Sequence, residues 1–279
     1  MRRLAVALLL TLTAPAIALA CTGVVLTDDQ SVIVGGNEDW ERWDAWMWAS
    51  PPGEGVHGVV YFGYEIRGEW GERAPFWYEF HGVNDQGLYF DSFGAPCVAP
   101  RSTLGNPWRG EHLMARAMEE CSTTEEAVAL FTGSNLLFMQ CQQFLFVDRR
   151  GTAAVIEGDE VVWMDGSSLA LTNFYLSDPT LGGYPCWRYD RVTSMLAQDA
   201  AATPGRAAEL LEAASHPGTR YSLVVDLVQG RGEVYYAHDF TNPLCLDLFA
   251  LAAVGCERLF LSDIMDGEHD AVSEFVCGE

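Results

Sequence analysis

Short strand-like runs, broken by blocks of helical sequence, constrain the fold of this chain more than any other feature. The alternating or β-branched runs lie at residues 21–26, 31–34, 58–64, 88–91, 143–147, 153–157, 161–164, 222–227 and 233–237. Helical patterns lie at residues 109–120, 124–132, 189–197 and 206–214. Strands that follow one another before a helical block are typical of an α+β fold and not of a repeated βαβ unit.

The first twenty residues have the three parts of an export signal. Arg2 and Arg3 precede an apolar run, and Ala18-Leu19-Ala20 forms a small-x-small cleavage site directly before Cys21. A lipoprotein signal also ends at a cysteine, but it requires a large aliphatic residue where this chain has Ala18. We therefore expect residues 1–20 to be a signal peptide, residues 21–279 to form a single domain, and the mature protein to be periplasmic or secreted.

The net charge of the chain argues against nucleic acid as a partner. The formal net charge is −23, which becomes −25 when Arg2 and Arg3 are removed, and such a field repels nucleic acid. No later segment has the roughly 20 apolar residues that a membrane-spanning helix requires.

Eight cysteines in an exported chain predict some disulfides. None of them lies in a Cys/His cluster with zinc spacing, so we expect no metal and no cofactor. The oligomeric state stays open.

Cys21 would become the first residue of the mature chain, which would give it a base of its own. The α-amine of a terminal residue titrates at roughly pH 8 and can accept the proton of the thiol. Attack of the thiolate on an amide carbonyl would form a thioester, which water then hydrolyses. None of the six histidines lies in a motif that ties it to a cysteine. The alternative is that Cys21 is one half of a disulfide.

The first two strand-like runs predict which residues return to Cys21. A turn centred on Asp29 pairs Cys21 with about Asn37. The carboxylate of Asp39 could then hold the α-amine and the thiol in register, whereas Glu38 is expected on the opposite face. The alternative for Asp39 is a polar residue in a turn at a strand end.

Six short motifs follow one another in an order typical of one enzyme family. They are Cys21-Thr22-Gly23-Val24, Gly36-Asn37-Glu38-Asp39-Trp40, Gly82-Val83-Asn84-Asp85-Gln86-Gly87-Leu88, Leu171-Thr172-Asn173, Trp187-Arg188-Tyr189-Asp190-Arg191, and Thr219-Arg220-Tyr221-Ser222 with Tyr235-Tyr236. In this combination the chain resembles the choloylglycine hydrolase family of N-terminal nucleophile (Ntn) hydrolases. That family includes bile salt hydrolases and penicillin V acylases, and it is related to acid ceramidase and the isopenicillin N acyltransferase group.

The resemblance implies a fold and a reaction. The fold is a four-layer αββα sandwich, and the reaction is hydrolysis of a linear, non-peptide amide bond in a small-molecule N-acyl substrate. Cys21 would be the nucleophile and base, and Asp39 would position it. Asn173 would donate to the oxyanion, and Arg188 would organise the surroundings of the nucleophile. An acyltransferase of the isopenicillin N type and an inactive secreted binding protein remain the alternative functions.

The chain departs from the family pattern at three places. Gly36 occupies the position of an arginine in bile salt hydrolases, so a cation is missing unless Arg42 or another arginine replaces it. The second oxyanion asparagine has no clear counterpart, and Ser92 is the nearest candidate. The segment between Asn173 and Arg188 is shorter than in bile salt hydrolases, which argues against a steroid conjugate as substrate.

Simpler interpretations exist for several of these residues. Asn173 could cap a turn after a strand, and Arg188 could lie on a solvated helix face. Four tryptophans follow Asp39 closely, and they could line an acyl pocket or pack the core: Trp40, Trp43, Trp46 and Trp48.

Overall fold

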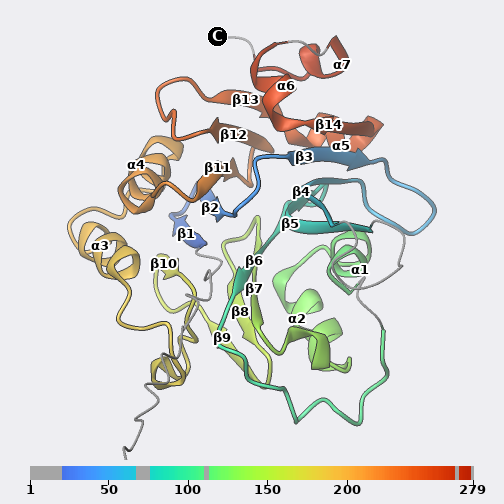
Figure 1. Ribbon diagram of the computed structural model, residues 1–279. Coiled ribbons are helices and arrows are strands. Elements are labelled where there is room, and N and C mark those ends of the chain that lie inside the picture. The colour runs from blue at the N-terminus through green and yellow to red at the C-terminus, as the bar shows by residue number, and fades with distance from the viewer. Residues whose placement is uncertain (1–20, 67–75, 110–112, 268–269, 278–279) are drawn as a thin grey trace, which may run out of the picture.

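Two antiparallel β-sheets pack face to face at the centre of the molecule (Figure 1). The computed structural model describes residues 21–66, 76–109, 113–267 and 270–277. The expected signal peptide, residues 1–20, lies outside the described residues.

The first sheet has six strands in the order β10-β1-β2-β11-β12-β13. Their bounds are Thr22–Thr27 for β1, Val32–Asp39 for β2, Ser168–Leu171 for β10, Thr219–Asp226 for β11, Arg231–Tyr236 for β12 and Leu244–Asp247 for β13. Strands from the beginning, the middle and the end of the chain therefore lie side by side.

The second sheet has eight strands in the order β14-β3-β4-β5-β6-β7-β8-β9. Their bounds are Ala45–Ser50 for β3, Val59–Ile66 for β4, Phe76–Asn84 for β5, Leu88–Gly94 for β6, Gln142–Asp148 for β7, Ala153–Glu157 for β8, Glu160–Trp163 for β9 and Cys256–Phe260 for β14. Sequential strands from β3 to β9 are direct neighbours, as in a meander of hairpins.

The largest apolar cluster fills the space between the sheets. Val25, Val34 and Leu223 from the first sheet pack there with Phe62 and Leu145 from the second. All five are fully buried. Alternate residues of a strand point to opposite faces, so the same strands also bury side chains on their outer faces.

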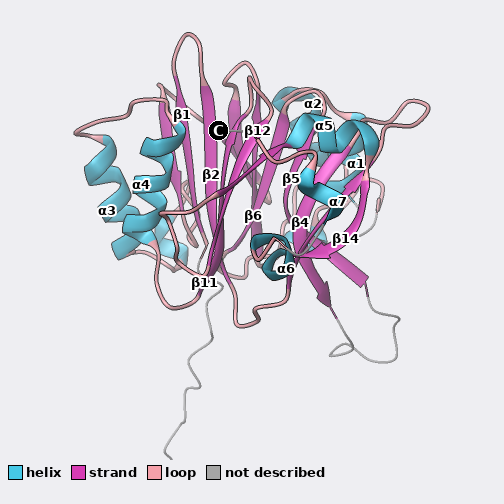
Figure 2. Ribbon diagram, turned by 90° about the horizontal axis from the view of Figure 1, so that it is seen from above, coloured by secondary structure: helices cyan, strands magenta, loops and turns pink. Residues whose placement is uncertain are grey.

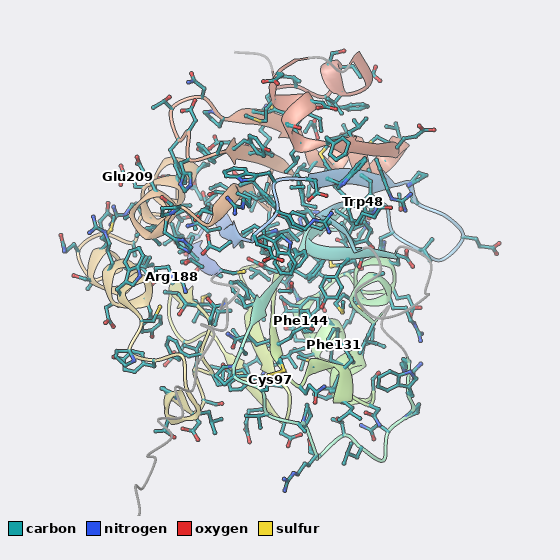
Figure 3. The ribbon with its side chains drawn as sticks, in the orientation of Figure 1. Trp48, Cys97, Phe131, Phe144, Arg188 and Glu209 are labelled. Carbon is teal, nitrogen blue, oxygen red and sulfur yellow. A yellow bond between two sulfur atoms is a disulfide. The ribbon has the colours of Figure 1, made fainter. Side chains whose placement is uncertain are left out.

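Helices cover the outer faces of both sheets (Figure 2). Helices α3 (Trp187–Leu196) and α4 (Pro204–Ala214) share an apolar cluster with β1 and β2 of the first sheet. Helices α1 (Leu113–Glu120) and α2 (Thr124–Thr132) cover the second sheet, where Phe131 of α2 packs on Phe144 of β7 with ring centroids 5.7 Å apart (Figure 3). The predicted α+β fold, a four-layer αββα sandwich, is confirmed.

Short elements complete the chain. They are α5 (Leu248–Val254), α6 (Leu261–Met265), α7 (Asp270–Ser273) and the 3-10 turns η1 (Leu137–Met139) and η2 (Pro179–Leu181). The structure forms the disulfides Cys97–Cys141 and Cys245–Cys277. Among the described residues, every helix is too short or too polar to cross a membrane.

Candidate active site

Cys21 directly precedes β1 and points into the space between the two sheets. Its side chain is 2% exposed and belongs to the same apolar cluster as Val25, which lies on the same face of the strand. At Gly23, a Cβ would lie 2.6 Å from the ring of Phe93, so only glycine lets β1 approach β6 this closely. The thiol is thus held at the start of a strand that lies between β10 and β2 in the first sheet and packs closely on β6 of the second.

The pairing of β1 with β2 differs by one residue from the prediction. Thr22 pairs with Asn37, and the turn is centred between Asp29 and Gln30 instead of on Asp29. A shift of one residue exchanges the two faces of a strand. Glu38 therefore lies on the same face as Cys21, and the prediction that it points away is wrong.

Glu38 is the direct hydrogen-bond partner of the thiol. Cys21 Sγ donates to Glu38 Oε2 over 3.9 Å, and Glu38 is fully buried. Burial raises the pKa of the Glu38 carboxyl, and the nearby Asp91 and Asp39 raise it further. Burial also raises the pKa of the Cys21 thiol, with Glu38, Asp39 and Asp91 acting in the same direction. Burial therefore favours the neutral form of both groups.

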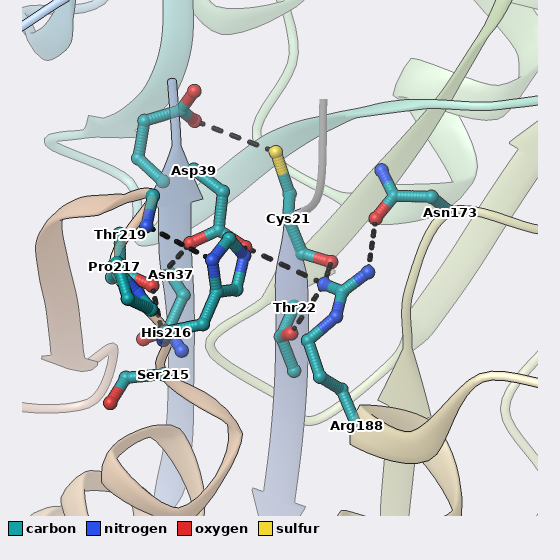
Figure 4. Close-up of polar contacts among 12 residues, drawn as sticks. Cys21, Thr22, Asn37, Asp39, Asn173, Arg188, Ser215, His216, Pro217 and Thr219 are labelled. Atoms are coloured by element: carbon teal, nitrogen blue, oxygen red, sulfur yellow. Dashed lines mark hydrogen bonds and ion pairs between the residues drawn. The ribbon is translucent and has the colours of Figure 1, made fainter. Parts of the chain in front are cut away.

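Asp39 turns its carboxylate to the other face of β2, where three side chains surround it (Figure 4). Thr219 Oγ1 donates to Asp39 Oδ1, and His216 Nε2 lies 2.9 Å from Asp39 Oδ2. Arg188 Nη1 lies 3.5 Å from the same oxygen. The backbone amide of Asp39, by contrast, hydrogen-bonds the Cys21 sulfur. Asp39 thus reaches the nucleophile through its main chain and through Arg188.

Arg188 joins the residues that the sequence placed in the site. It is 6% exposed, and α3 directs it at the start of β1. Nη1 donates to the Cys21 carbonyl oxygen at 2.5 Å and to Thr22 Oγ1 at 3.0 Å, and Nη2 donates to Asn173 Oδ1 at 2.8 Å. Arg188 is therefore a buried bridge and not part of a solvated helix face.

Asn173 lies beside Cys21 because β10 pairs with β1. The register joins Gly23 to Leu171, and its continuation by two residues brings Asn173 opposite Cys21. Asn173 Nδ2 donates to the Gly94 carbonyl at 2.9 Å, and this bond uses one of its two N–H groups. The second N–H is the one that could serve an oxyanion.

Gly36, the position at which bile salt hydrolases have an arginine, has no room for a side chain in this structure. A Cβ on Gly36 would lie 2.3 Å from Asp91 Oδ2 and 2.7 Å from His81 Nε2. These two residues form a buried pair at 3.2 Å, and Tyr221 and Tyr89 hydrogen-bond its two ends. The His81–Asp91 pair therefore occupies the space that a longer side chain would need.

Neither substitute that the sequence suggested reaches the thiol. Arg42 pairs with Asp44 and donates to the Glu65 carbonyl at 2.9 Å. Ser92 lies on the face of β6 that Leu88 and Phe90 turn toward helices α1 and α2. Ser92 is thus excluded as a second oxyanion donor.

The four tryptophans differ in their surroundings. Trp46 and Trp48 lie on the face of β3 that packs with the helices, as part of the core. Trp40 packs on Tyr64 and Phe80, with centroid distances of 5.6 and 5.3 Å, in the cluster that contains Cys21. Trp43 is 46% exposed.

Two residues of this site were missed by sequence reasoning. Glu38 was assigned to the wrong face because the register was one residue off. His216 lies in the turn between α4 and β11, and it is 177 positions from its partner Asp39. No local motif connects these two residues, so the sequence carried no signal for the contact.

Comparisons with known proteins agree with this architecture. No protein-family model matches the sequence, and no curated protein matches it. The structure is similar to a Cys-to-Ala mutant of conjugated bile acid hydrolase from Clostridium perfringens, with a TM-score of 0.63 and 15% identity over 86% of this chain and 96% of that one. It is also similar to penicillin V acylase from Agrobacterium tumefaciens, with a TM-score of 0.57 and 15% identity over 82% of this chain and 87% of that one. The chain has the fold of these proteins, so the resemblance drawn from its motifs is confirmed at the level of the fold.

Proposed function

We propose that this protein is an exported Ntn hydrolase that cleaves a linear, non-peptide amide with Cys21 as its N-terminal nucleophile. The observation that carries the proposal is the bridge made by Arg188, which contacts Cys21, Asp39 and Asn173 at once. The bridge lies beside Cys21 at the start of β1, in a structure whose fold is similar to those of a bile acid hydrolase and a penicillin acylase.

The reaction begins with a proton transfer within Cys21. After removal of residues 1–20, the free α-amine accepts the thiol proton, and the thiolate attacks the amide carbonyl of the substrate. The free N–H of Asn173 stabilises the negative charge that develops on the carbonyl oxygen. The C–N bond then breaks, the leaving amine takes the proton, and the acyl group remains on Sγ as a thioester. Water hydrolyses the thioester and restores the thiol.

Arg188 has a positioning role in this scheme. Its bonds to the Cys21 carbonyl and to Asn173 Oδ1 hold the nucleophile and the oxyanion donor at a set separation. Its charge also offsets that of Asp39, which is buried beside it. The guanidinium does not touch the substrate in this proposal.

The proposal is tested by separating the thiol from the α-amine. Cys21→Ala abolishes turnover of N-acyl amides and prevents acyl-enzyme formation, which intact mass spectrometry detects. A protein that keeps Cys21 but retains one uncleaved residue before it is also inactive, because an amide nitrogen cannot accept the proton. Cys121→Ala removes another buried, free thiol and keeps full activity, which makes it the matched control.

Two results would contradict the proposal. Turnover by the protein with the extra residue would indicate an ordinary cysteine hydrolase with a separate base. Recovery of a diacylglyceryl-modified Cys21 from cells would show that the α-amine belongs to a lipoprotein and not to a free N-terminus.

A further inference from the structure

Four of the buried polar atoms that lack hydrogen-bond partners in the described part of the chain belong to β2, the segment directly after it, β4 and β11. They are Glu38 Oε1, Trp40 Nε1, Tyr64 OH and Arg220 Nε. Buried polar groups in folded proteins are almost always paired, so a group of unpaired ones marks a place for a ligand or for water. Trp40, Tyr64 and Arg220 all offer a donor, which indicates a ligand rich in acceptors.

Arg220 is the most unusual of these residues. It is 9% exposed, and its guanidinium stacks on the ring of Trp43 at 4.1 Å from the centroid. Its polar contact within the described residues is a bond from Nη1 to the Pro217 carbonyl at 3.3 Å, and no described carboxylate pairs with it. The other buried arginine of the site, Arg188, pairs with Asp39. A buried cation without a counter-ion is unfavourable, so Arg220 is suited to an anionic ligand.

The strand order places Arg220 close to the nucleophile. Arg220 lies in the bulge of β11 between Thr219, which pairs with Asp39, and Tyr221, which pairs with Glu38. Since β11, β2 and β1 are neighbours, the backbone of Arg220 is two strand spacings, roughly 10 Å, from the start of β1. An arginine side chain and a short acyl chain together span such a distance.

Tyr64 is within electrostatic reach of both Cys21 and Arg220. Burial raises the pKa of the Tyr64 phenol, Glu38 and Cys21 raise it further, and Arg220 lowers it. Trp40 packs against the Tyr64 ring and brings its Nε1 to the same region.

We propose that Arg220, together with Tyr64 and Trp40, binds a carboxylate on the acyl part of the substrate. The inference rests on the proposed amide hydrolysis and names its substrate class as N-acyl amides of dicarboxylic acids. The acyl part is assigned because it stays on Sγ after the amine has left, and it therefore remains beside these buried residues. Burial of Glu38 disfavours its charged form, which reduces its repulsion of the anion.

The test compares matched substrates. Adipoyl para-nitroanilide carries a terminal carboxylate, and its methyl ester has nearly the same shape without the charge. Because a hydrogen bond to a charged group contributes about 1.5–3 kcal/mol, we expect the wild-type enzyme to prefer the acid by about tenfold or more in kcat/KM. Arg220→Gln lowers kcat/KM for the acid to about that for the ester and so removes this preference.

Arg149→Gln is the matched control. Arg149 also stacks on an aromatic ring, that of Phe249, but it is exposed and lies on the β7–β8 turn. The variant loses the same charge and keeps the preference for the acid. Equal kcat/KM for acid and ester in the wild type, or an unchanged ratio in Arg220→Gln, would overturn the inference.

A binding measurement distinguishes failure of this inference from failure of the proposed function. Adipoyl para-nitroanilide and its methyl ester are each titrated calorimetrically into the Cys21→Ala variant and into the double variant Cys21→Ala with Arg220→Gln. If the wild type turns over neither substrate, the proposed hydrolysis fails, and carboxylate-dependent binding that is lost in the Arg220→Gln background still supports the anion site. If the acid and the ester bind equally, the anion site is refuted whatever the activity.

Discussion

At the residue scale, each polar group of the site has one contact that fixes its position and one property that is left for chemistry. Arg188 holds Asn173 through Oδ1 and leaves the amide nitrogen to donate. Glu38 Oε2 accepts a hydrogen bond from the Cys21 thiol, and Glu38 Oε1 has no described partner. Substitutions that alter only one of the two atoms can therefore separate positioning from catalysis.

Asn173 offers such a substitution. Asn173→Ala lowers kcat by about a hundredfold or more, because an oxyanion donor contributes mainly in the transition state. Asn173→Asp keeps an acceptor for Arg188 but loses the donor, so its kcat falls as far. Steady-state kinetics with one amide substrate measures both. Near-normal kcat in Asn173→Asp would instead assign Asn173 the single role of holding Arg188.

Glu38 makes the stability of the fold depend on pH. Its pKa is raised in the folded state, so the folded protein binds more protons than the unfolded chain above the ordinary glutamate pKa. The stability is fully present below that value and is lost as pH rises through the folded-state pKa. Glu38→Gln, which stays neutral, therefore raises the free energy of unfolding relative to wild type more at about pH 7 than at about pH 4.

Denaturant unfolding at both pH values checks this expectation. The matched control is Glu209→Gln, because Glu209 is 63% exposed and forms a surface ion pair with Arg206 (Figure 3). It changes stability little at either pH. An equal effect of Glu38→Gln at both pH values would show that the Glu38 carboxyl ionises in the folded protein as it does in the unfolded chain.

At the scale of elements, the site depends on how β2 packs across the sheets. Gly36 of β2 faces Asp91 of β6 and His81 of β5, which come from the second sheet. The absence of a side chain at Gly36 lets the buried His81–Asp91 pair lie behind the nucleophile. The packing of these three strands therefore leaves no room for a side chain at Gly36.

Gly36→Ala tests that packing. The new Cβ would lie 2.3 Å from Asp91 Oδ2, so the His81–Asp91 pair must move. Overpacking of this kind lowers the free energy of unfolding by about 1–3 kcal/mol. Gly105→Ala is the control, since a Cβ there has no neighbour within 4 Å. Unfolding midpoints in urea compare the two, and equal midpoints would mean that the pair adjusts freely.

At the scale of the whole molecule, the Cys97–Cys141 disulfide closes the long excursion between β6 and β7. The segment it encloses contains α1 and α2, and the two cysteines are 44 residues apart. In the loop-entropy description, a crosslink of this span stabilises the folded state by about 4 kcal/mol. The bond also holds the loop after Gly94, whose carbonyl accepts from Asn173.

Removal of this bond therefore weakens the fold as a whole. Cys97→Ser with Cys141→Ser lowers the free energy of unfolding by about 2–4 kcal/mol, measured by denaturant titration. Cys256→Ser, at a free and half-buried cysteine, is the control. A loss no larger than that of the control would show that the unfolded chain is already compact in this region.

The location of most strands and helices of this protein could be predicted from the sequence alone. Strand alternation and helical periodicity located most of the elements, including β7, β8, α2 and α4, because these signals lie among near neighbours. Strands β3, β5, β10, β13 and β14 were not predicted: the tryptophans of β3 were ambiguous, and β10 and β13 have four residues each. Motifs at Cys21, Asp39, Asn173 and Arg188 identified the residues that the fold then brings together.

How those residues face one another depends on the tertiary structure and could not be predicted from the sequence. The turn between β1 and β2 sets a register, and a shift of one residue moved Glu38 from the far face to the thiol. His216 contacts Asp39 because strand order brings together segments nearly 180 positions apart. The same strand order places Arg220 near β2, where it has no described counter-ion. Such contacts depend on the register and packing of whole sheets, which no local stretch of sequence specifies.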